Sequence, residues 1–194
     1  MPVALTIGRA AGYTAASLTL RLIVGALDLA IEAGIAAAIS LAWLQGSGLP
    51  LPPRYWNAFD YLVDVAGTVP EAIAIPALIF AGVFLVWETA FGSLLGAAPV
   101  ARLAGMRLVT TSGRKPGVVR VGLRAALALP LALAAGIGPA TALASPRRRM
   151  LHDILAGCLV LRGDVPDGWG RRQDADSDAG LSPGPRSYLD VPRR

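Results

Sequence analysis

The sequence predicts an all-α integral membrane protein with two full transmembrane helices, a third hydrophobic segment broken by proline and glycine, and a small cytoplasmic two-stranded β element. Hydrophobic residues make up 54% of the 194 residues and charged residues only 16%, whereas soluble domains carry about 25% charged residues. Apolar runs occupy residues 22–44, 72–87 and 125–144, and a helix needs about 20 apolar residues to cross the hydrocarbon core. The length leaves room for one membrane domain.

The first span is predicted over residues 17–44, because the following stretch QGSGLPLPP breaks the helix with glycine and proline. An outer loop is predicted over residues 45–69. Within it, PRYWNAFDYLVDVAG interleaves aromatic and acidic residues after Pro53, and proline suits a first helical turn. This stretch is either a short helix at the outer membrane interface or a packed loop helix without lipid contact.

The second span is predicted over residues 70–90 and an inner loop over residues 91–120. The stretch from Glu88 to Arg120 holds five basic residues against one acid, whereas the outer loop, counted up to Glu71, holds one basic residue against three acids. Basic residues mark cytoplasmic loops. We therefore expect the N-terminal segment, residues 1–16, to be cytoplasmic and the outer loop to face the other side.

The third segment, predicted over residues 121–144, leaves its topology open. If it crosses the membrane once, the basic stretch SPRRR that follows lies outside, against the distribution of charge in the other loops. A re-entrant hairpin, or a third and fourth span, would keep both termini cytoplasmic, and bends at membrane depth are tolerated where protein buries them. The breaking residues are Pro130, Gly136, Gly138 and Pro139. The re-entrant form is favoured because it keeps positive charge inside.

Two stretches alternate like strands, MRLVTTSGRKPG in the inner loop and GCLVLRG further along the chain. We expect them to pair as the small sheet. Residues 146–162 are expected to lie at the membrane interface, with Arg147, Arg148 and Arg149 as a topology anchor or as ligands of anionic lipid head groups. Residues 163–194 are rich in Pro, Gly, Asp and Arg without apolar periodicity, which predicts a disordered cytoplasmic tail.

The first span carries three ionisable residues, Arg21, Asp28 and Glu32. At about 100° per residue they share one stripe of a helix. Arg21 can extend towards the interface, but Asp28 and Glu32 lie about 10 Å and 16 Å deeper along the axis. Buried carboxylates need a partner or a proton. The stripe therefore indicates either a proton or ion site, as intramembrane ionisable residues often do, or an interhelical contact that only fixes packing.

The order and spacing of RLIVGALD, AAPVARLAGMRLVTTSGRKPG and RRRMLHDILAGCLVLR resemble the RDD family of small bacterial membrane proteins, over residues 17–162. The arginine and two aspartates for which that family is named fall on Arg21, Asp28 and Asp153. The resemblance implies a multi-pass protein of the bacterial plasma membrane. For some members of this family a sodium/proton antiport activity has been proposed, and others have no known function. The chain departs from the family pattern at Ala98, Val100, Ala101 and Cys158.

Two functional hypotheses follow. In the first, the chain is a transporter subunit that exchanges a monovalent cation for protons. Asp28 and Glu32 would bind the ion or proton, and Arg21 would pair with Asp153. Because two spans make a thin wall for a pathway, this hypothesis requires a homo-oligomer or a partner membrane protein. In the second, the chain is a non-catalytic structural or assembly subunit of a larger membrane complex, and the charged stripe docks a partner helix.

Other residues carry weaker signals. Glu88 is a possible partner of Arg21 or Arg124, and the sequence does not choose between them. His152 beside Asp153 is interpreted as a packing residue rather than a proton relay. With one cysteine, Cys158, and one histidine in the chain, no disulfide, metal site or other cofactor is expected. No motif pairs a nucleophile with a base, so no catalytic residue and no enzyme activity are predicted. Nucleic acid is not an expected partner.

Overall fold

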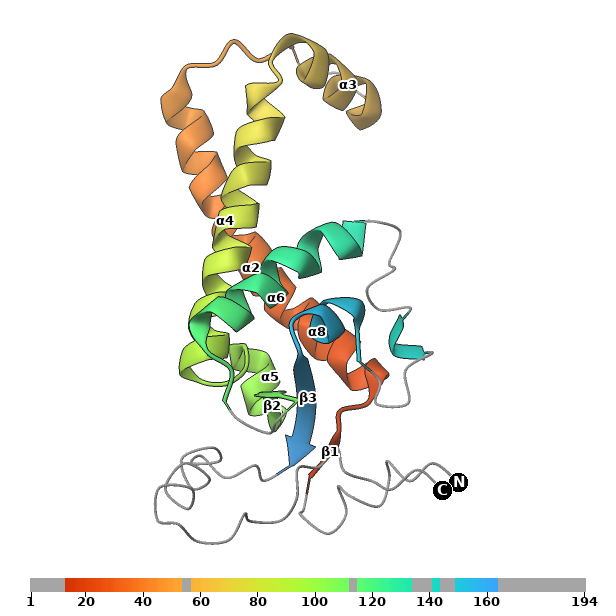
Figure 1. The fold of residues 1–194 in the computed structure, drawn as a ribbon. Coiled ribbons are helices and arrows are strands. Elements are labelled where there is room, and N and C mark those ends of the chain that lie inside the picture. Colours follow the sequence, from red (N-terminus) through yellow and green to blue (C-terminus); the bar gives the residue numbers. More distant parts are fainter. Residues whose placement is uncertain (1–12, 54–56, 112–114, 134–140, 144–148, 164–194) are drawn as a thin grey trace, which may run out of the picture. The chain divides into compact units, whose positions relative to one another are not determined.

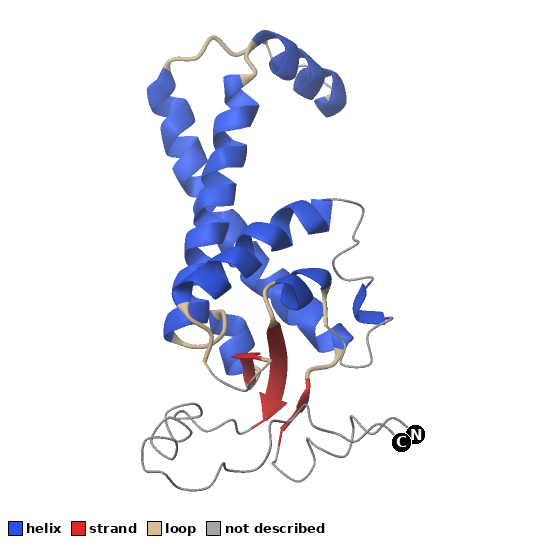
Figure 2. Ribbon diagram, viewed as in Figure 1, coloured by secondary structure: helices blue, strands red, loops and turns tan. Residues whose placement is uncertain are grey.

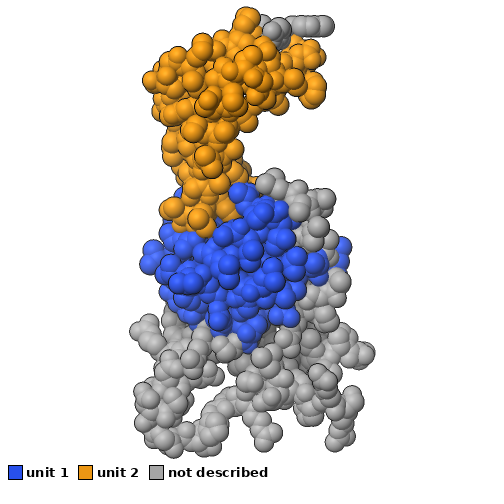
Figure 3. All heavy atoms as spheres, turned by 45° about the horizontal axis from the view of Figure 1, so that its top comes forward, with its two compact units in different colours: residues 1–28, 87–194 blue, residues 29–86 orange. Residues whose placement is uncertain are grey.

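The computed structural model describes residues 13–53, 57–111, 115–133, 141–143 and 149–163 (Figure 1). The chain divides into two compact units (Figure 3). Unit 1 comprises residues 1–28 and 87–194, and unit 2 comprises residues 29–86. The predicted tail from residue 164 on, the bend at residues 136–139 and the anchor residues Arg147 and Arg148 lie outside the described residues, whereas Gly163, predicted as the start of the tail, ends strand β3, Cys158–Gly163.

The two long apolar helices predicted from the sequence are present. Helix α2, Leu18–Ser47, extends three residues beyond its predicted end, and α4, Glu71–Leu94, runs past Trp87 to Leu94. The segments Leu18–Ser47 and Glu71–Leu103 each reach a mean hydropathy of 2.0 and are long and apolar enough to cross a membrane. Many of their large side chains are exposed, such as Leu78 at 67%.

The predicted helix of the outer loop is α3, Ala58–Thr68. Asn57 caps its N-terminus, since the Asn57 side chain accepts a hydrogen bond of 2.9 Å from the backbone N–H of Phe59. The exposed side of α3 carries apolar residues three and four positions apart, Phe59, Leu62 and Val63. An exposed apolar stripe favours the interface helix over the packed loop helix.

Unit 1 contains the sheet, whose strand order is β1-β3-β2 (Figure 2). Strands β2, Met106–Thr110, and β3, Cys158–Gly163, pair antiparallel with Leu108 opposite Val160, which confirms the predicted pairing. The structure adds β1, Tyr13–Ala15, on the other side of β3. The expectation of two strands was therefore incomplete: three residues are too few to show an alternating pattern, and β1 is defined by its partner.

Both longer strands follow a very short helix and a glycine. Helix α5, Pro99–Leu103, precedes β2, and α8, Leu151–Leu155, precedes β3. The connecting glycines, Gly105 and Gly157, have φ of 71° and 63°. Glycine adopts these left-handed angles without strain, so in each case it ends the helix and turns the chain into the strand.

Helix α6, Val118–Leu133, forms the start of the third hydrophobic segment and begins before the predicted residue 121. Pro130 lies inside α6, so the helix is not broken there as the sequence suggested. It packs closely on α4. A Cβ atom added to Gly92 would meet the Cγ1 atom of Val121 at 2.6 Å. The core of unit 1 lies between α6, α8 and the sheet, around Leu108, Val121, Ala156 and Cys158.

A buried ion-pair cluster as the candidate functional site

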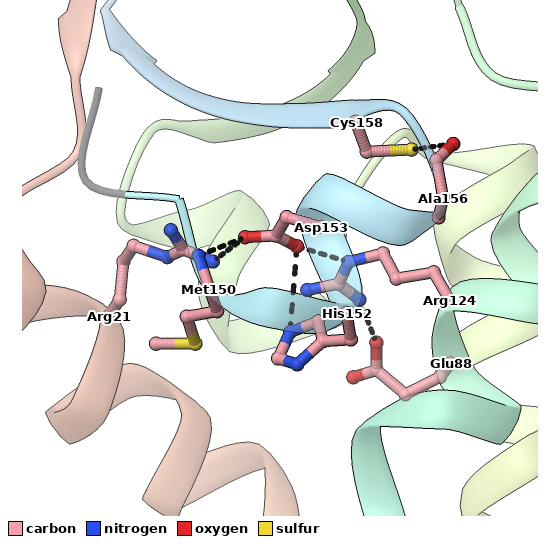
Figure 4. Close-up of polar contacts among 8 residues, drawn as sticks. All are labelled: Arg21, Glu88, Arg124, Met150, His152, Asp153, Ala156 and Cys158. Carbon is pink, nitrogen blue, oxygen red and sulfur yellow. Dashed lines mark hydrogen bonds and ion pairs between the residues drawn. The ribbon is translucent and has the colours of Figure 1, made fainter. Parts of the chain in front are cut away.

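Asp153 is the centre of a charged cluster in unit 1 and is 0% exposed (Figure 4). Its Oδ2 atom accepts a hydrogen bond from Nη2 of Arg21 on α2, and the two side chains form an ion pair. Its Oδ1 atom lies 2.9 Å from Nε of Arg124 on α6. The structure thus brings Arg21 and Asp153 together as the sequence analysis proposed, and adds Arg124 as a second cation.

The cluster extends through Arg124 to a fourth helix. Nη1 of Arg124 donates a hydrogen bond of 3.0 Å to Oε2 of Glu88 on α4. This settles the choice that the sequence left open, because Glu88 pairs with Arg124. Two guanidinium groups and two carboxylates therefore form one chain of contacts that links α2, α8, α6 and α4. Formal charges cancel within it, which is the condition under which ions are tolerated in a protein interior.

The local sequence explains why Asp153 faces this cluster. Asp153 is the third residue of α8, and its Oδ2 atom also accepts a hydrogen bond of 3.3 Å from the backbone N–H of Met150. A carboxylate at this position satisfies one of the backbone donors that every helix start leaves open. Asp153 therefore caps its own helix while it binds the two arginines.

Asp28 plays the same part for the other short helix, from a distance in sequence. Its Oδ1 atom accepts a hydrogen bond of 3.0 Å from the backbone N–H of Val100, and its Oδ2 atom one of 3.2 Å from that of Ala101. Ala98, the N-cap residue of α5, makes no side-chain cap. Asp28, on α2, thus supplies the acceptor that α5 lacks, and it fastens α2 to the helix that leads into β2.

The whole predicted stripe of α2 is buried. Arg21, Asp28 and Glu32 are 9%, 3% and 1% exposed, respectively. Their shared face confirms the helical geometry inferred from their spacing. Glu32 belongs to unit 2, whereas Arg21 and Asp28 belong to unit 1.

One further titratable group, His152, borders Asp153. Burial lowers the pKa of His152 to about 4, with help from Arg124 and Arg21 and against the opposing effect of Asp153, so the imidazole is neutral at pH 7. Its Nε2 atom lies 3.5 Å from Oδ1 of Asp153. Burial would raise the pKa of Asp153, but Arg124 and Arg21 outweigh it and hold that pKa well below its usual range. Asp153 is therefore ionised.

Cys158 shows no sign of reactivity. Its side chain is fully buried, and its Sγ atom lies 3.6 Å from the carbonyl oxygen of Ala156 (Figure 4). Burial raises the pKa of the thiol, so the nucleophilic thiolate is disfavoured. Within the described residues, no group of three His, Cys, Asp or Glu side chains is arranged to hold a metal ion.

A cavity of about 100 Å³ lies beside the cluster. Small residues such as Gly25, Gly92 and Ala97 leave the space, which is large enough for several water molecules. The charged residues that line it are Arg21, Arg107, Arg124, Asp28 and Glu88.

Comparison with protein families decides what kind of chain this is. Residues 15–157 match the family model described as the RDD family. The chain belongs to the RDD family. The matched region of this RDD chain begins in β1 and ends just before β3, so it includes the complete ion-pair cluster. No match was found among curated proteins or among solved structures.

Sequence reasoning and structure differ on what surrounds the RDD aspartates. The contacts made by Asp28 are to the backbone N–H groups of Val100 and Ala101, and those of Asp153 include the backbone of Met150. Backbone donors leave no side-chain signature, so no pattern in the sequence pointed to them. Of the three predicted anchor arginines, only Arg149 lies within the described residues, where it is half-buried.

Proposed function

We propose that this RDD chain is a multi-pass protein of the bacterial plasma membrane, with its N-terminus cytoplasmic, and that it serves as a non-transporting structural subunit of a larger membrane assembly. In this proposal its charged residues hold the membrane helices to the sheet. The proposal gives the chain no catalytic role. Family membership and two apolar helices suggest a membrane protein, and the contacts of the two aspartates support the structural role.

The observation that carries the structural role is the occupancy of the aspartate oxygens. Each oxygen of Asp28 accepts a backbone hydrogen bond, and each oxygen of Asp153 contacts a guanidinium group. A carboxylate that must bind and release a cation or proton needs exchangeable partners, whereas these partners belong to the fold. If Asp28 released these partners, α5 would lose its cap, and if Asp153 released them, buried arginines would lose a counter-charge.

The lining of the cavity argues in the same direction. Three arginines and two acidic residues line a space of about 100 Å³. Arg21 and Arg124 are neutralised by Asp153 and Glu88, which leaves Arg107 beside Asp28, so the lining carries no excess of negative charge that would attract a monovalent cation. The arrangement is better suited to holding water against a fixed network of ion pairs.

Cation/proton exchange is the second candidate, and one observation favours it. The carboxylates of Asp28 and Glu88 line the same cavity, so a proton taken up there could pass between two acids through water. In that case Asp28 would be the ion- or proton-binding residue, with Glu32 as a deeper site on the same helix. This mechanism would require a homo-oligomer or partner to complete the pathway.

A flux measurement separates the two candidates. Purified protein would be reconstituted in liposomes that contain a pH-sensitive dye and exposed to pulses of sodium, lithium and potassium. We expect wild type and Asp28→Asn to give the same signal as empty liposomes. A cation-dependent proton flux in wild type that Asp28→Asn abolishes, while the exposed control variant Asp60→Asn retains it, would overturn the structural proposal in favour of exchange.

A further inference from the structure

Helix α6 is amphipathic in the opposite sense to a helix of a water-soluble protein. Two close approaches define the face of α6 that packs on α4. A Cβ atom added to Gly92 of α4 would meet Val121 of α6, and one added to Gly122 of α6 would meet Thr89 of α4. That inward face also carries Arg124, which reaches Glu88 and Asp153. Arg124 therefore points into the protein, whereas Arg120, one turn nearer the N-terminus of α6, is exposed.

The outward face of α6 is apolar. It consists of residues three and four positions apart that are all exposed, Val119, Leu123, Ala126 and Pro130. At about 100° per residue they fall within a sector of roughly 60°, so they form one continuous stripe. Val119 is 87% exposed, and in water such a stripe would be costly.

The charge around this stripe is of one sign. Residues 115–133 contain no acidic residue, and the exposed basic residues Lys115 and Arg120 lie at the N-terminal end of the segment. Lys115 also donates a hydrogen bond of 3.0 Å to the backbone carbonyl of Leu94, and Nη1 of Arg120 lies close to Gly157, so both side chains are held at this end of α6. Apolar side chains flanked by lysine and arginine complement the acyl chains and anionic head groups of a lipid leaflet. A partner protein would instead have to offer an apolar groove beside an acidic rim, and contact with such a protein is one of the outcomes that the test below separates.

We propose that α6 is a lipid-contacting helix, whose outward stripe of Val119, Leu123, Ala126 and Pro130 faces acyl chains while Lys115 and Arg120 meet anionic head groups. This inference rests on the proposed membrane location of the chain and extends it to a third helix. The described 16 residues of α6 rise about 24 Å, less than the roughly 30 Å of a hydrocarbon core. The contact therefore does not require α6 to cross the bilayer within these residues.

Spin labelling in vesicles tests the inference. Nitroxides would be attached one at a time to Val119→Cys, Leu123→Cys and Ala126→Cys, in vesicles of phosphatidylcholine with or without phosphatidylglycerol. The native Cys158 is 0% exposed, and labelled wild type reports any background. We expect collisions with oxygen to exceed collisions with a water-soluble nickel complex several-fold at the three sites. Lys115→Cys should show the reverse.

Two controls keep the outcomes separate. Leu78→Cys on α4 tests the membrane proposal itself, because Leu78 is exposed on a candidate span. If Leu78 is lipid-exposed while the α6 sites are open to nickel or shielded from both reagents, the stripe contacts water or protein and the inference fails alone. If Leu78 also favours nickel, the membrane proposal fails. We also expect Arg120→Gln to reduce the difference in collision rates that the Val119 label shows between vesicles with and without phosphatidylglycerol. An unchanged difference would overturn the head-group contact.

Discussion

The two units of the chain differ in the polar contacts that they contain, although both expose apolar side chains and unit 2 also buries Glu32. Unit 1 buries charge, with Asp153 at 0% exposure between two arginines. Unit 2 exposes apolar surface, including Leu78 and Leu41. In water both choices would be unfavourable, but each becomes reasonable if the apolar helices lie in lipid and the charges bind one another. The contrast indicates that both units depend on the solvent around them, and that the fold of unit 1 depends in addition on a network of specific ion pairs.

Neutralising the centre of the cluster should have the largest effect on this contrast. Asp153→Asn leaves Arg21 and Arg124 buried without their shared counter-charge, which should lower the free energy of unfolding by about 3–5 kcal/mol. Unfolding can be followed by SDS titration in mixed micelles. The control is Asp60→Asn in unit 2, an exposed residue that accepts a surface hydrogen bond from Asn57, which should change stability little. Equal effects of the two substitutions would contradict the account.

The pH dependence of stability should follow His152. Its pKa is about 4 in the folded protein and about 6.5 in an unfolded chain, so the unfolded state binds the proton first as pH falls. This contribution to stability is complete above pH 6.5 and is lost towards pH 4, by roughly 3 kcal/mol over that window. Unfolding free energies of wild type and His152→Gln between pH 7 and pH 4 test this. A slope that persists unchanged in His152→Gln would assign it to another group.

Asp153 acts in the same direction at lower pH. Because its folded pKa lies below the unfolded value of 3.8, its contribution is present above that value and is lost only as pH falls through the folded pKa. The two residues therefore affect different pH windows, His152 between pH 6.5 and pH 4 and Asp153 below it.

Two glycines of one helix offer a smaller and sharper comparison. In α4, Gly92 lies against Val121, where an added Cβ atom would meet Cγ1 at 2.6 Å, whereas an added Cβ atom at Gly82 meets nothing within 4 Å. Gly92→Ala should cost about 1–3 kcal/mol through overpacking. Gly82→Ala should instead stabilise the helix by about 0.5–1 kcal/mol. Melting temperatures in detergent would show the sign of each change, and a Gly92→Ala variant at least as stable as wild type would mean that α4 and α6 do not pack as described.

The sequence predicted those parts of the molecule that depend on periodicity and composition. The long apolar runs gave α2 and α4, and short alternating stretches gave β2 and β3. The position of Arg21, Asp28 and Glu32 on one buried stripe followed from helical spacing alone. Each of these features is a property of neighbouring residues in the chain.

The parts that the sequence did not predict depend on tertiary contacts. The partners of Asp28 are the backbone N–H groups of Val100 and Ala101, which lie 72 and 73 positions further along the chain. Almost any residue type at those positions could supply such a group. Strand β1 exists because β3 offers it an edge. Pro130 was expected to help break its segment, but it lies inside α6. Whether Asp28 and Glu32 also bind an ion stays a prediction.

The geometry also changes how the central ion pair should be tested. A charge exchange between Arg21 and Asp153 follows naturally from the sequence, but it would place a guanidinium group at position 153 against Arg124, which now contacts Asp153 at 2.9 Å. Like charges in this buried site would repel. Neutral substitutions are therefore the appropriate probes.

The most direct test of the structural account is a double-mutant cycle with Arg21→Gln and Asp153→Asn. Unfolding free energies would be measured for wild type, both single variants and the double variant in mixed micelles. If the pair joins α2 to α8, the two changes should be non-additive, with a coupling energy of about 1–3 kcal/mol. The control cycle of Arg21→Gln with Asp60→Asn should be additive. Additivity in the Arg21–Asp153 cycle as well would contradict the claim that these buried charges hold the fold together.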